Sequence, residues 1–292
     1  MLRLSRRSLA LSMPALITLR PSSGRAAEDK YFDSAGVRIR YVEAGQGDPV
    51  VLVHGFSSNV ENQWVRSGVM PKLADRYRVI AFDGRGHGLS DKPHDPALYG
   101  PEASRDTSRL LDHLGLRKAH VVGYSLGAHL VAWLVTDSPD RFVTCTLGGA
   151  CGRFRWSEEK TAEVLAEAAE MDEGLQRSQI LRLWPKDQPP PSDEQIRAQS
   201  ARALAGQDHK ALAASRRGGL RLVMPEERMA AITVPAIGIV GSADGYLADF
   251  TALRQINPRI DVTVIEGAGH SAAPGRPEFV QTLDRFLSAH RA

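Results

Sequence analysis

A serine flanked by glycines, Gly123-Tyr124-Ser125-Leu126-Gly127, stands between a strand-like apolar run and a helix-like run. The two glycines permit a turn sharp enough to expose the serine hydroxyl, as a nucleophilic serine requires. Leu126 begins the predicted helix, and its backbone N–H would stabilise negative charge that develops on a reacting carbonyl oxygen. A simple glycine turn is the alternative interpretation, and the strand-to-helix context favours the nucleophile.

A base and an acid that could activate this serine follow two later strand-like runs. A serine hydroxyl is a weak nucleophile until a neighbouring base takes its proton, and histidine titrates near neutrality. Among the nine histidines, His270 has the best setting, shortly after the run Asp261–Ile265. Asp244 follows the run Pro235–Val240 and is the predicted acid that orients the histidine. Asp249 is the nearest rival, but it falls inside the next predicted helix.

The segment His54-Gly55-Phe56 directly follows another strand-like run. Gly55 would let the backbone turn close to the serine, and the N–H of Phe56 would be the second donor to an oxyanion. The side chain of His54 is expected to shape the loop by hydrogen bonding and to transfer no proton.

Large aromatic side chains near these segments are candidates for a substrate pocket. Aromatic residues favour apolar acyl or aryl groups, so the pocket is predicted to take a largely apolar substrate. Packing in the core is the alternative for each of them. The candidates are Trp64, Tyr124, Trp156 and Trp184.

The elements that must position these residues alternate between strand and helix. Continuous apolar runs are typical of parallel strands that are buried on both faces. Such alternation predicts an α/β fold whose mostly parallel sheet has helices on both faces. The predicted strands are Val37–Glu43, which should be antiparallel, Pro49–Val53, Tyr77–Phe82, Ala119–Val122, Phe142–Leu147, Pro235–Val240 and Asp261–Ile265, and the predicted helices cover about 62–75, 102–114, 126–137 and 277–289.

The pattern changes at residue 152, from where the chain has helix-like segments and no strand-like run until about residue 225. Ser192 and Gln195 have the spacing of a capping box at the start of one of these helices. We therefore predict a helical cap over about 152–225, inserted into a core formed by 27–151 and 226–292.

These features resemble the α/β-hydrolase superfamily over roughly residues 31–292. The chain order of serine, aspartate and histidine is the one that superfamily uses. The segment Asp83–Ser90 is similar to the D-x-R-G-x-G-x-S turn of the branch that contains esterases, C–C bond hydrolases, dehalogenases and cofactor-free haloperoxidases. The resemblance implies the α/β-hydrolase fold, a loop-holding role for Asp83 and Arg85, and no catalytic role for His87.

The resemblance also implies a reaction class. Dehalogenases and epoxide hydrolases carry aspartate at the position of Ser125, so both activities are disfavoured here. The favoured activity is hydrolysis of a carboxylic ester or lactone of a small to medium, largely apolar substrate through an acyl-enzyme, without a cofactor. C–C bond hydrolases, expected to have a polar pocket, and cofactor-free perhydrolases or haloperoxidases use the same three residues and stay open as alternatives. A non-catalytic ligand-binding protein on this fold is a further alternative.

The charge of the chain argues against large charged partners. The formal net charge is +3, but residues 1–26 contain five arginines and no acidic residue, which leaves 32 basic against 34 acidic residues. This balance predicts a small-molecule substrate and no binding to nucleic acid. No Cys/His cluster has zinc spacing, so no metal is expected. Cys145 and Cys151 are more consistent with two buried thiols than with a disulfide, and both interpretations stay open.

The first 26 residues resemble an export signal. Ser5–Leu9 is similar to a twin-arginine signal, and the apolar run Leu9–Leu19 is too short to cross a bilayer of roughly 30 Å. We expect cleavage after about Ala26 and a periplasmic or secreted mature protein without membrane insertion. The alternative is an extension without a targeting role in a cytoplasmic protein. Retention of Met1 in protein isolated from its natural host would contradict export.

Overall fold

The computed structural model describes residues 28–184 and 188–291. The predicted signal over 1–26 lies outside these residues, so export stays a prediction. No helix in the described part of the chain combines the length and apolar character needed to cross a membrane.

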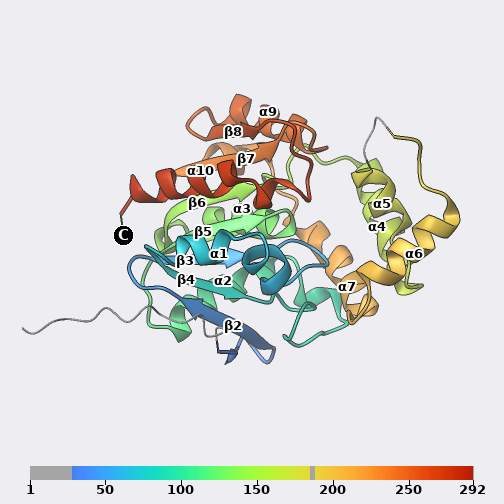
Figure 1. Ribbon diagram of the computed structural model, residues 1–292, viewed down its shortest axis with the longest axis horizontal. Coiled ribbons are helices and arrows are strands. Elements are labelled where there is room, and N and C mark those ends of the chain that lie inside the picture. Colours follow the sequence, from blue (N-terminus) through green and yellow to red (C-terminus); the bar gives the residue numbers. More distant parts are fainter. Residues whose placement is uncertain (1–27, 185–187, 292) are drawn as a thin grey trace, which may run out of the picture.

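Eight strands in the described residues form one sheet. They are β1 (Lys30–Asp33), β2 (Arg38–Ala44), β3 (Pro49–Val53), β4 (Arg78–Phe82), β5 (Ala119–Tyr124), β6 (Phe142–Gly148), β7 (Ala236–Gly241) and β8 (Asp261–Ile265). Their order is β1-β2-β4-β3-β5-β6-β7-β8 (Figure 1). β2 pairs antiparallel with β1 and β4, and the pairs from β4 through β8 are parallel. The predicted mostly parallel sheet is confirmed.

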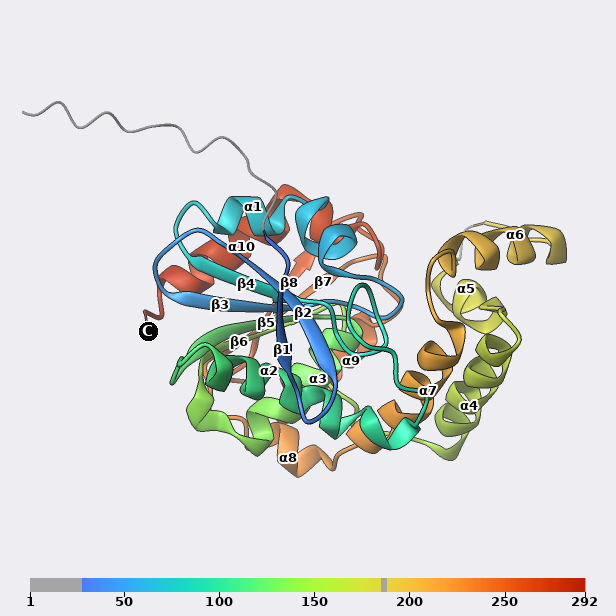
Figure 2. The same cartoon turned by 90° about the horizontal axis from the view of Figure 1, so that it is seen from below.

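Helices cover both faces of the sheet, as predicted (Figure 2). α1 (Val69–Leu73) and α10 (Pro277–Ser288) pack on one face. α2 (Pro101–His113), α3 (Leu126–Asp137) and α9 (Leu247–Ile256) pack on the other. The inner strands are continuous apolar runs because neither face of the sheet meets water.

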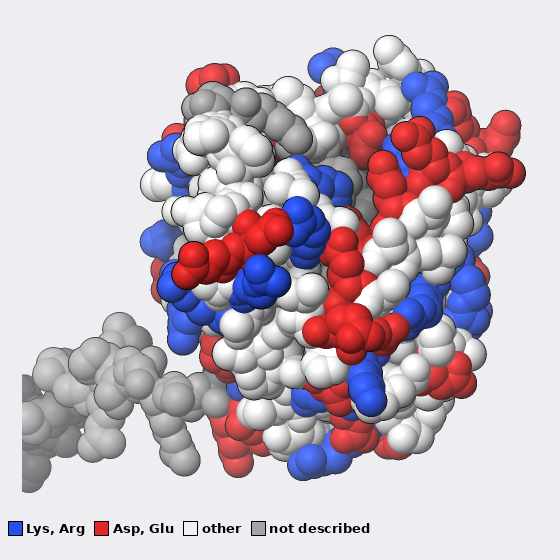
Figure 3. All heavy atoms as spheres, turned by 90° about the vertical axis from the view of Figure 1, so that its right-hand side faces the viewer, with Lys and Arg blue, Asp and Glu red and all other residues white. Residues whose placement is uncertain are grey.

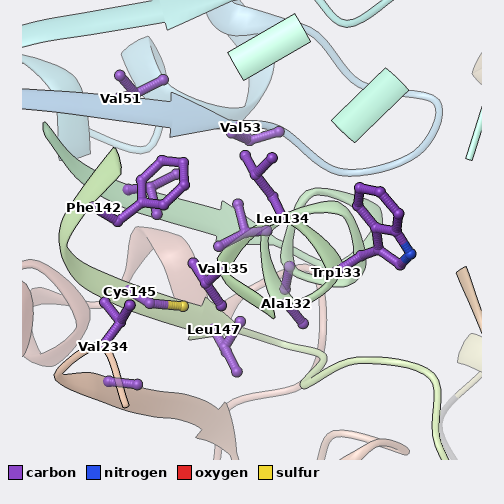
Figure 4. Close-up of a cluster of buried hydrophobic side chains, with 14 of the residues drawn as sticks. Val51, Val53, Ala132, Trp133, Leu134, Val135, Phe142, Cys145, Leu147 and Val234 are labelled. Carbon is purple, nitrogen blue, oxygen red and sulfur yellow. The ribbon is translucent and has the colours of Figure 1, made fainter. Parts of the chain in front are cut away.

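Alternate residues of each inner strand enter two separate apolar clusters, because successive side chains of a strand point to opposite faces. In β3, Val51 and Val53 join the cluster that contains α3, whereas Val50 and Leu52 join the cluster that contains α1 and α10. Figure 4 shows the first cluster, with Leu134 of α3 close to Val53. Both clusters hold the strand ends, from which the site residues project, in a close-packed core.

The structure differs from the predicted elements in two places. The short edge strand β1 was not predicted. The helix expected over 62–75 is two shorter segments, Glu61–Val65 and α1. Between them Gly68 has a φ of 80°, a left-handed conformation that interrupts a right-handed helix. Cys145 and Cys151 are both buried free thiols.

After β6, the described residues include four helices that we call the cap: α4 (Glu158–Asp172), α5 (Arg177–Leu183), α6 (Asp193–Ala203) and α7 (His209–Gly219). Figures 1 and 2 show α4, α5 and α6 standing to one side of the sheet, with α7 nearer to it. The capping box of Ser192 and Gln195 is present at the start of α6. The cap contacts the core through Gln207, whose amide donates to the carbonyl oxygen of Ser57 at 3.2 Å. The short helix α8 (Glu226–Ala230) leads back to β7.

Candidate active site

Ser125 lies in a strained turn at the carboxyl end of the central strand β5. Its φ is 53°, a left-handed value that residues other than glycine rarely adopt. Its backbone N–H donates to the carbonyl oxygen of Gly148 at 2.8 Å, and α3 begins at the next residue. The turn presents the hydroxyl to a cavity that Ser125 helps to line.

The glycines on either side of Ser125 are required by close approach of the backbone. A Cβ atom on Gly127 would lie 2.1 Å from the carbonyl oxygen of Val53, and one on Gly123 would lie 2.4 Å from the carbonyl oxygen of Gly127. Both distances are far below van der Waals contact. The turn can therefore pack against β3 only because these side chains are absent.

His270 joins Ser125 to Asp244 through two hydrogen bonds, although the three residues follow different strands. Nε2 of His270 lies 3.0 Å from Oγ of Ser125, and Nδ1 lies 2.8 Å from Oδ2 of Asp244. The Asp244 side chain is fully buried, and its Oδ1 accepts the backbone N–H of Tyr246 at 3.0 Å. The hydroxyl of Tyr124 donates to the carbonyl oxygen of His270. In this arrangement a carboxylate orients the imidazole, and the imidazole can take the serine proton.

The backbone of Phe56 and that of Leu126 border the same cavity as Ser125. Within the described part of the chain, neither backbone N–H has a hydrogen-bond acceptor. Two free donors beside a nucleophile can stabilise an oxyanion. Gly55 allows the approach, because a Cβ atom there would lie 3.3 Å from Cβ of Ser125.

His54 and Asp83 form hydrogen bonds that connect neighbouring loops. Nδ1 of His54 lies 2.7 Å from the carbonyl oxygen of Gly55, and its Nε2 accepts the N–H of Gly84 at 2.9 Å. Asp83 accepts the backbone N–H groups of Val60 and Leu89, both at 2.9 Å. These bonds join the loops after β3 and β4, and they match the structural roles expected for His54 and Asp83.

The side chains of Arg85 and His87, which belong to the turn Asp83–Ser90, are buried away from the reacting atoms. Arg85 pairs with Asp106 and also donates to the carbonyl oxygen of Leu98 at 2.8 Å. His87 packs edge-to-face against Phe56, with ring centroids 5.7 Å apart. Burial lowers the pKa of His87 to about 3, so this imidazole is neutral at physiological pH.

The cavity beside Ser125 has a volume of about 260 Å³ and differs from the predicted aromatic pocket. Tyr124 lines it, whereas Trp64 is fully buried in the core under α1 and does not. Trp156 lines a neighbouring cavity of about 120 Å³. Trp184 lines neither cavity, and its indole N–H donates to the carbonyl oxygen of Pro189 at 2.9 Å. Three of the four predicted pocket residues therefore do not line the cavity beside the serine.

Polar and cationic side chains take the place of the predicted aromatic ones. The surface that faces Ser125 is therefore polar, whereas the sequence predicted an aromatic pocket for a largely apolar substrate. These residues were not predicted, because an arginine is usually solvated and no local pattern in the sequence marks it as buried. The main members of this lining are Gln63, His129, Arg153, Arg182, Arg216 and Tyr246.

Comparisons with known proteins identify the fold. Residues 48–177 match the family model described as alpha/beta hydrolase fold. The chain is 35% identical over 131 residues to the dihydrolipoyllysine-residue acetyltransferase component of the acetoin cleaving system of Cupriavidus necator, covering 44% of this chain and 33% of that protein. The chain thus spans only about a third of that relative's length.

Other similar proteins are matched over more of their length. The chain is 28% identical over 222 residues to 3-oxoadipate enol-lactonase 1 of Acinetobacter baylyi, covering 74% of this chain and 81% of that protein. A carboxylesterase crystal structure from Nitrososphaera gargenis superposes with a TM-score of 0.72 at 19% identity, covering 89% of this chain and 98% of that one. At that identity the structural likeness concerns the fold alone.

Proposed function

The chain has the α/β-hydrolase fold and homologues among hydrolases of that fold, and from this premise we propose that it is a serine hydrolase of carboxylic esters or lactones. The single observation that carries the proposal is the hydrogen-bonded series from Ser125 through His270 to Asp244, at 3.0 and 2.8 Å. Serine as the nucleophile favours acyl transfer over the displacement of a halide.

The proposed reaction has two halves. Ser125 Oγ attacks the carbonyl carbon while His270 Nε2 takes its proton, and the N–H groups of Phe56 and Leu126 donate to the oxyanion. The tetrahedral intermediate collapses, and His270 protonates the departing alcohol oxygen. Water then attacks the acyl-enzyme with His270 again as base, which releases the acid and restores the serine. Asp244 keeps its negative charge and stabilises the imidazolium in both halves.

A panel of 4-nitrophenyl esters of increasing acyl length, run on wild type and Ser125→Ala, tests this proposal. We expect kcat/KM for ester cleavage to fall by about 10³-fold or more in Ser125→Ala, because covalent catalysis is lost. Equal rates in the two proteins would refute the assigned nucleophile.

Fluorophosphonate labelling checks the same atom directly. Wild type and the matched control Ser58→Ala, which alters another serine of the cavity lining, should be labelled, whereas Ser125→Ala should not. Labelling that survives in Ser125→Ala would count against the proposal.

One observation favours a second candidate function, the hydrolysis of a C–C bond next to a carbonyl. The cavity beside Ser125 is polar, as expected for a substrate with several oxygen atoms. The same three residues would serve this reaction. Turnover of a vinylogous 1,5-diketone at a higher kcat/KM than any ester of the panel would favour this candidate.

A further inference from the structure

A guanidinium group is buried beside the candidate nucleophile without an acidic partner. Arg153 is 4% exposed, and one of its terminal nitrogens donates to the carbonyl oxygen of Gly219 at 2.7 Å. Its Nε is buried without a hydrogen-bond acceptor among the described residues, and none of their ion pairs includes Arg153. Burial, aided by the nearby charge of Arg216, lowers the pKa of Arg153 to about 10, so it remains a cation at neutral pH.

Two further arginines lie at the same place and share one carboxylate. Nε of Arg182 lies 3.0 Å and Nη2 of Arg216 lies 3.2 Å from the Glu167 carboxylate. Arg216 is mostly buried, its guanidinium lies 4.0 Å from the ring centroid of Phe56, and its Nε also has no acceptor within the described residues. Glu167 thus pairs with two of the three guanidinium groups that line the cavity of Ser125, and Arg153 has no ion pair among the described residues.

Two other acidic groups near this cluster line the neighbouring cavity. The three arginines line both cavities, whereas Glu163, Asp249 and Lys160 line the neighbouring cavity and not that of Ser125. Among the residues that the structure describes, no acidic side chain lines the cavity of Ser125 itself. Figure 3 shows that acidic and basic side chains are interspersed on the outer face of the cap side, so the cationic character belongs to the interior.

A buried cation without a counter-charge is costly, and a ligand that brings the counter-charge removes that cost. We infer that Arg153 and Arg216 form an anion-binding subsite beside Ser125, and that the substrate carries a carboxylate group held there while Ser125 attacks its ester or lactone carbonyl. This inference rests on the proposed hydrolytic function. It extends that proposal by naming an anionic substrate class.

The free donors favour a carboxylate over a larger anion. Each of the two arginines has an Nε–H without an acceptor in the described structure, and a carboxylate offers two oxygen atoms to such donors. A phosphate monoester has three terminal oxygen atoms and a higher charge, and so brings more acceptors than these two free Nε–H donors. The volume of about 260 Å³ suits a short carbon chain between the carboxylate and the scissile carbonyl.

Two chromogenic esters that differ by one methyl group and by charge test this inference: 4-nitrophenyl hydrogen glutarate and its neutral methyl ester. Spontaneous release of 4-nitrophenolate is measured with Ser125→Ala and subtracted. We expect wild type to prefer the anionic ester by about tenfold or more in kcat/KM, as for a charge-assisted hydrogen bond. Arg153→Met should lower that ratio towards one, with a smaller loss on the neutral ester.

Arg155→Met is the matched control, because Arg155 is close in the chain but exposed and paired with Glu226. It should keep the wild-type ratio. A wild-type ratio near one, or equal ratios in wild type and Arg153→Met, would overturn the inference while leaving the proposed hydrolase intact. If circular dichroism shows that Arg153→Met does not fold, Arg153→Lys replaces it. Lysine lacks the planar guanidinium group, so this variant should also lower the ratio.

Binding of glutarate separates failure of the subsite from failure of the hydrolase. Calorimetry on Ser125→Ala should detect glutarate, with at least about tenfold weaker binding once Arg153→Met is added. If neither ester is cleaved, this binding result still decides the inference. Undetectable glutarate binding, or inorganic phosphate bound as tightly as glutarate, would contradict a carboxylate subsite.

Discussion

At the scale of single residues, the environment of Asp244 explains how one carboxylate can serve the histidine. Its side chain is fully buried, and its two oxygen atoms accept from different donors, Nδ1 of His270 and the N–H of Tyr246. The carboxylate therefore cannot rotate without losing one of these bonds. Asp249, the rival in the sequence, lies in α9 and lines the neighbouring cavity.

Replacement of Asp244 by asparagine should lower kcat for ester cleavage by about 10³- to 10⁴-fold, because an amide neither stabilises the imidazolium nor enforces the reactive tautomer. Steady-state kinetics with a 4-nitrophenyl ester measure this loss. Asp249→Asn, the matched control, should stay within a few fold of wild type. Comparable losses in both variants would show that the orienting acid is wrongly assigned.

At the scale of elements, the site is built where several parallel strands end. β5 leads to Ser125, β7 leads to Asp244 and β8 leads to His270, and these strands lie in the same half of the sheet, with β6 between β5 and β7. The turn after β5 must also pass close to β3, whose end carries the loop of Phe56. Contact between these two turns sets the distance between the nucleophile and its oxyanion donors.

Gly127→Ala should therefore impair stability and catalysis together. The added Cβ would lie 2.1 Å from the carbonyl oxygen of Val53, and overpacking of this kind costs about 1–3 kcal/mol of unfolding free energy. We expect a lower urea midpoint and at least about tenfold lower kcat/KM. The control is Gly275→Ala, where nothing lies within 4 Å of the new atom. A wild-type midpoint for Gly127→Ala would contradict the close packing.

At the scale of the whole molecule, stability depends on keeping a core imidazole uncharged. His120 lies in β5, fully buried, with Nδ1 2.8 Å from the hydroxyl of Thr144 in β6. Burial lowers its pKa to about 4 from the ordinary 6.5. Between these pH values the unfolded chain binds more protons than the folded one, so stability is complete above about pH 6.5 and falls as the pH drops towards 4.

His120→Asn should remove this part of the acid sensitivity. Two to three pKa units correspond to about 3 kcal/mol, so wild type should lose up to that much more unfolding free energy than the variant between pH 7 and pH 4. Urea unfolding at a series of pH values measures the difference. Parallel pH profiles for the two proteins would refute the role of His120.

Local patterns in the sequence predicted the sheet, the capping box at Ser192 and the candidates Ser125, Asp244 and His270. These features depend on neighbouring residues, because turns and strands have local sequence patterns. The break at Gly68 and the edge strand β1 were not predicted, because the backbone conformation and the edge pairing depend on contacts with distant residues. Only the tertiary structure placed Trp64 in the core and brought Arg153, Arg182 and Arg216 to the cavity of Ser125. Whether a charged side chain is buried depends on elements far away in the chain, so the spacing of residues within one segment cannot predict it.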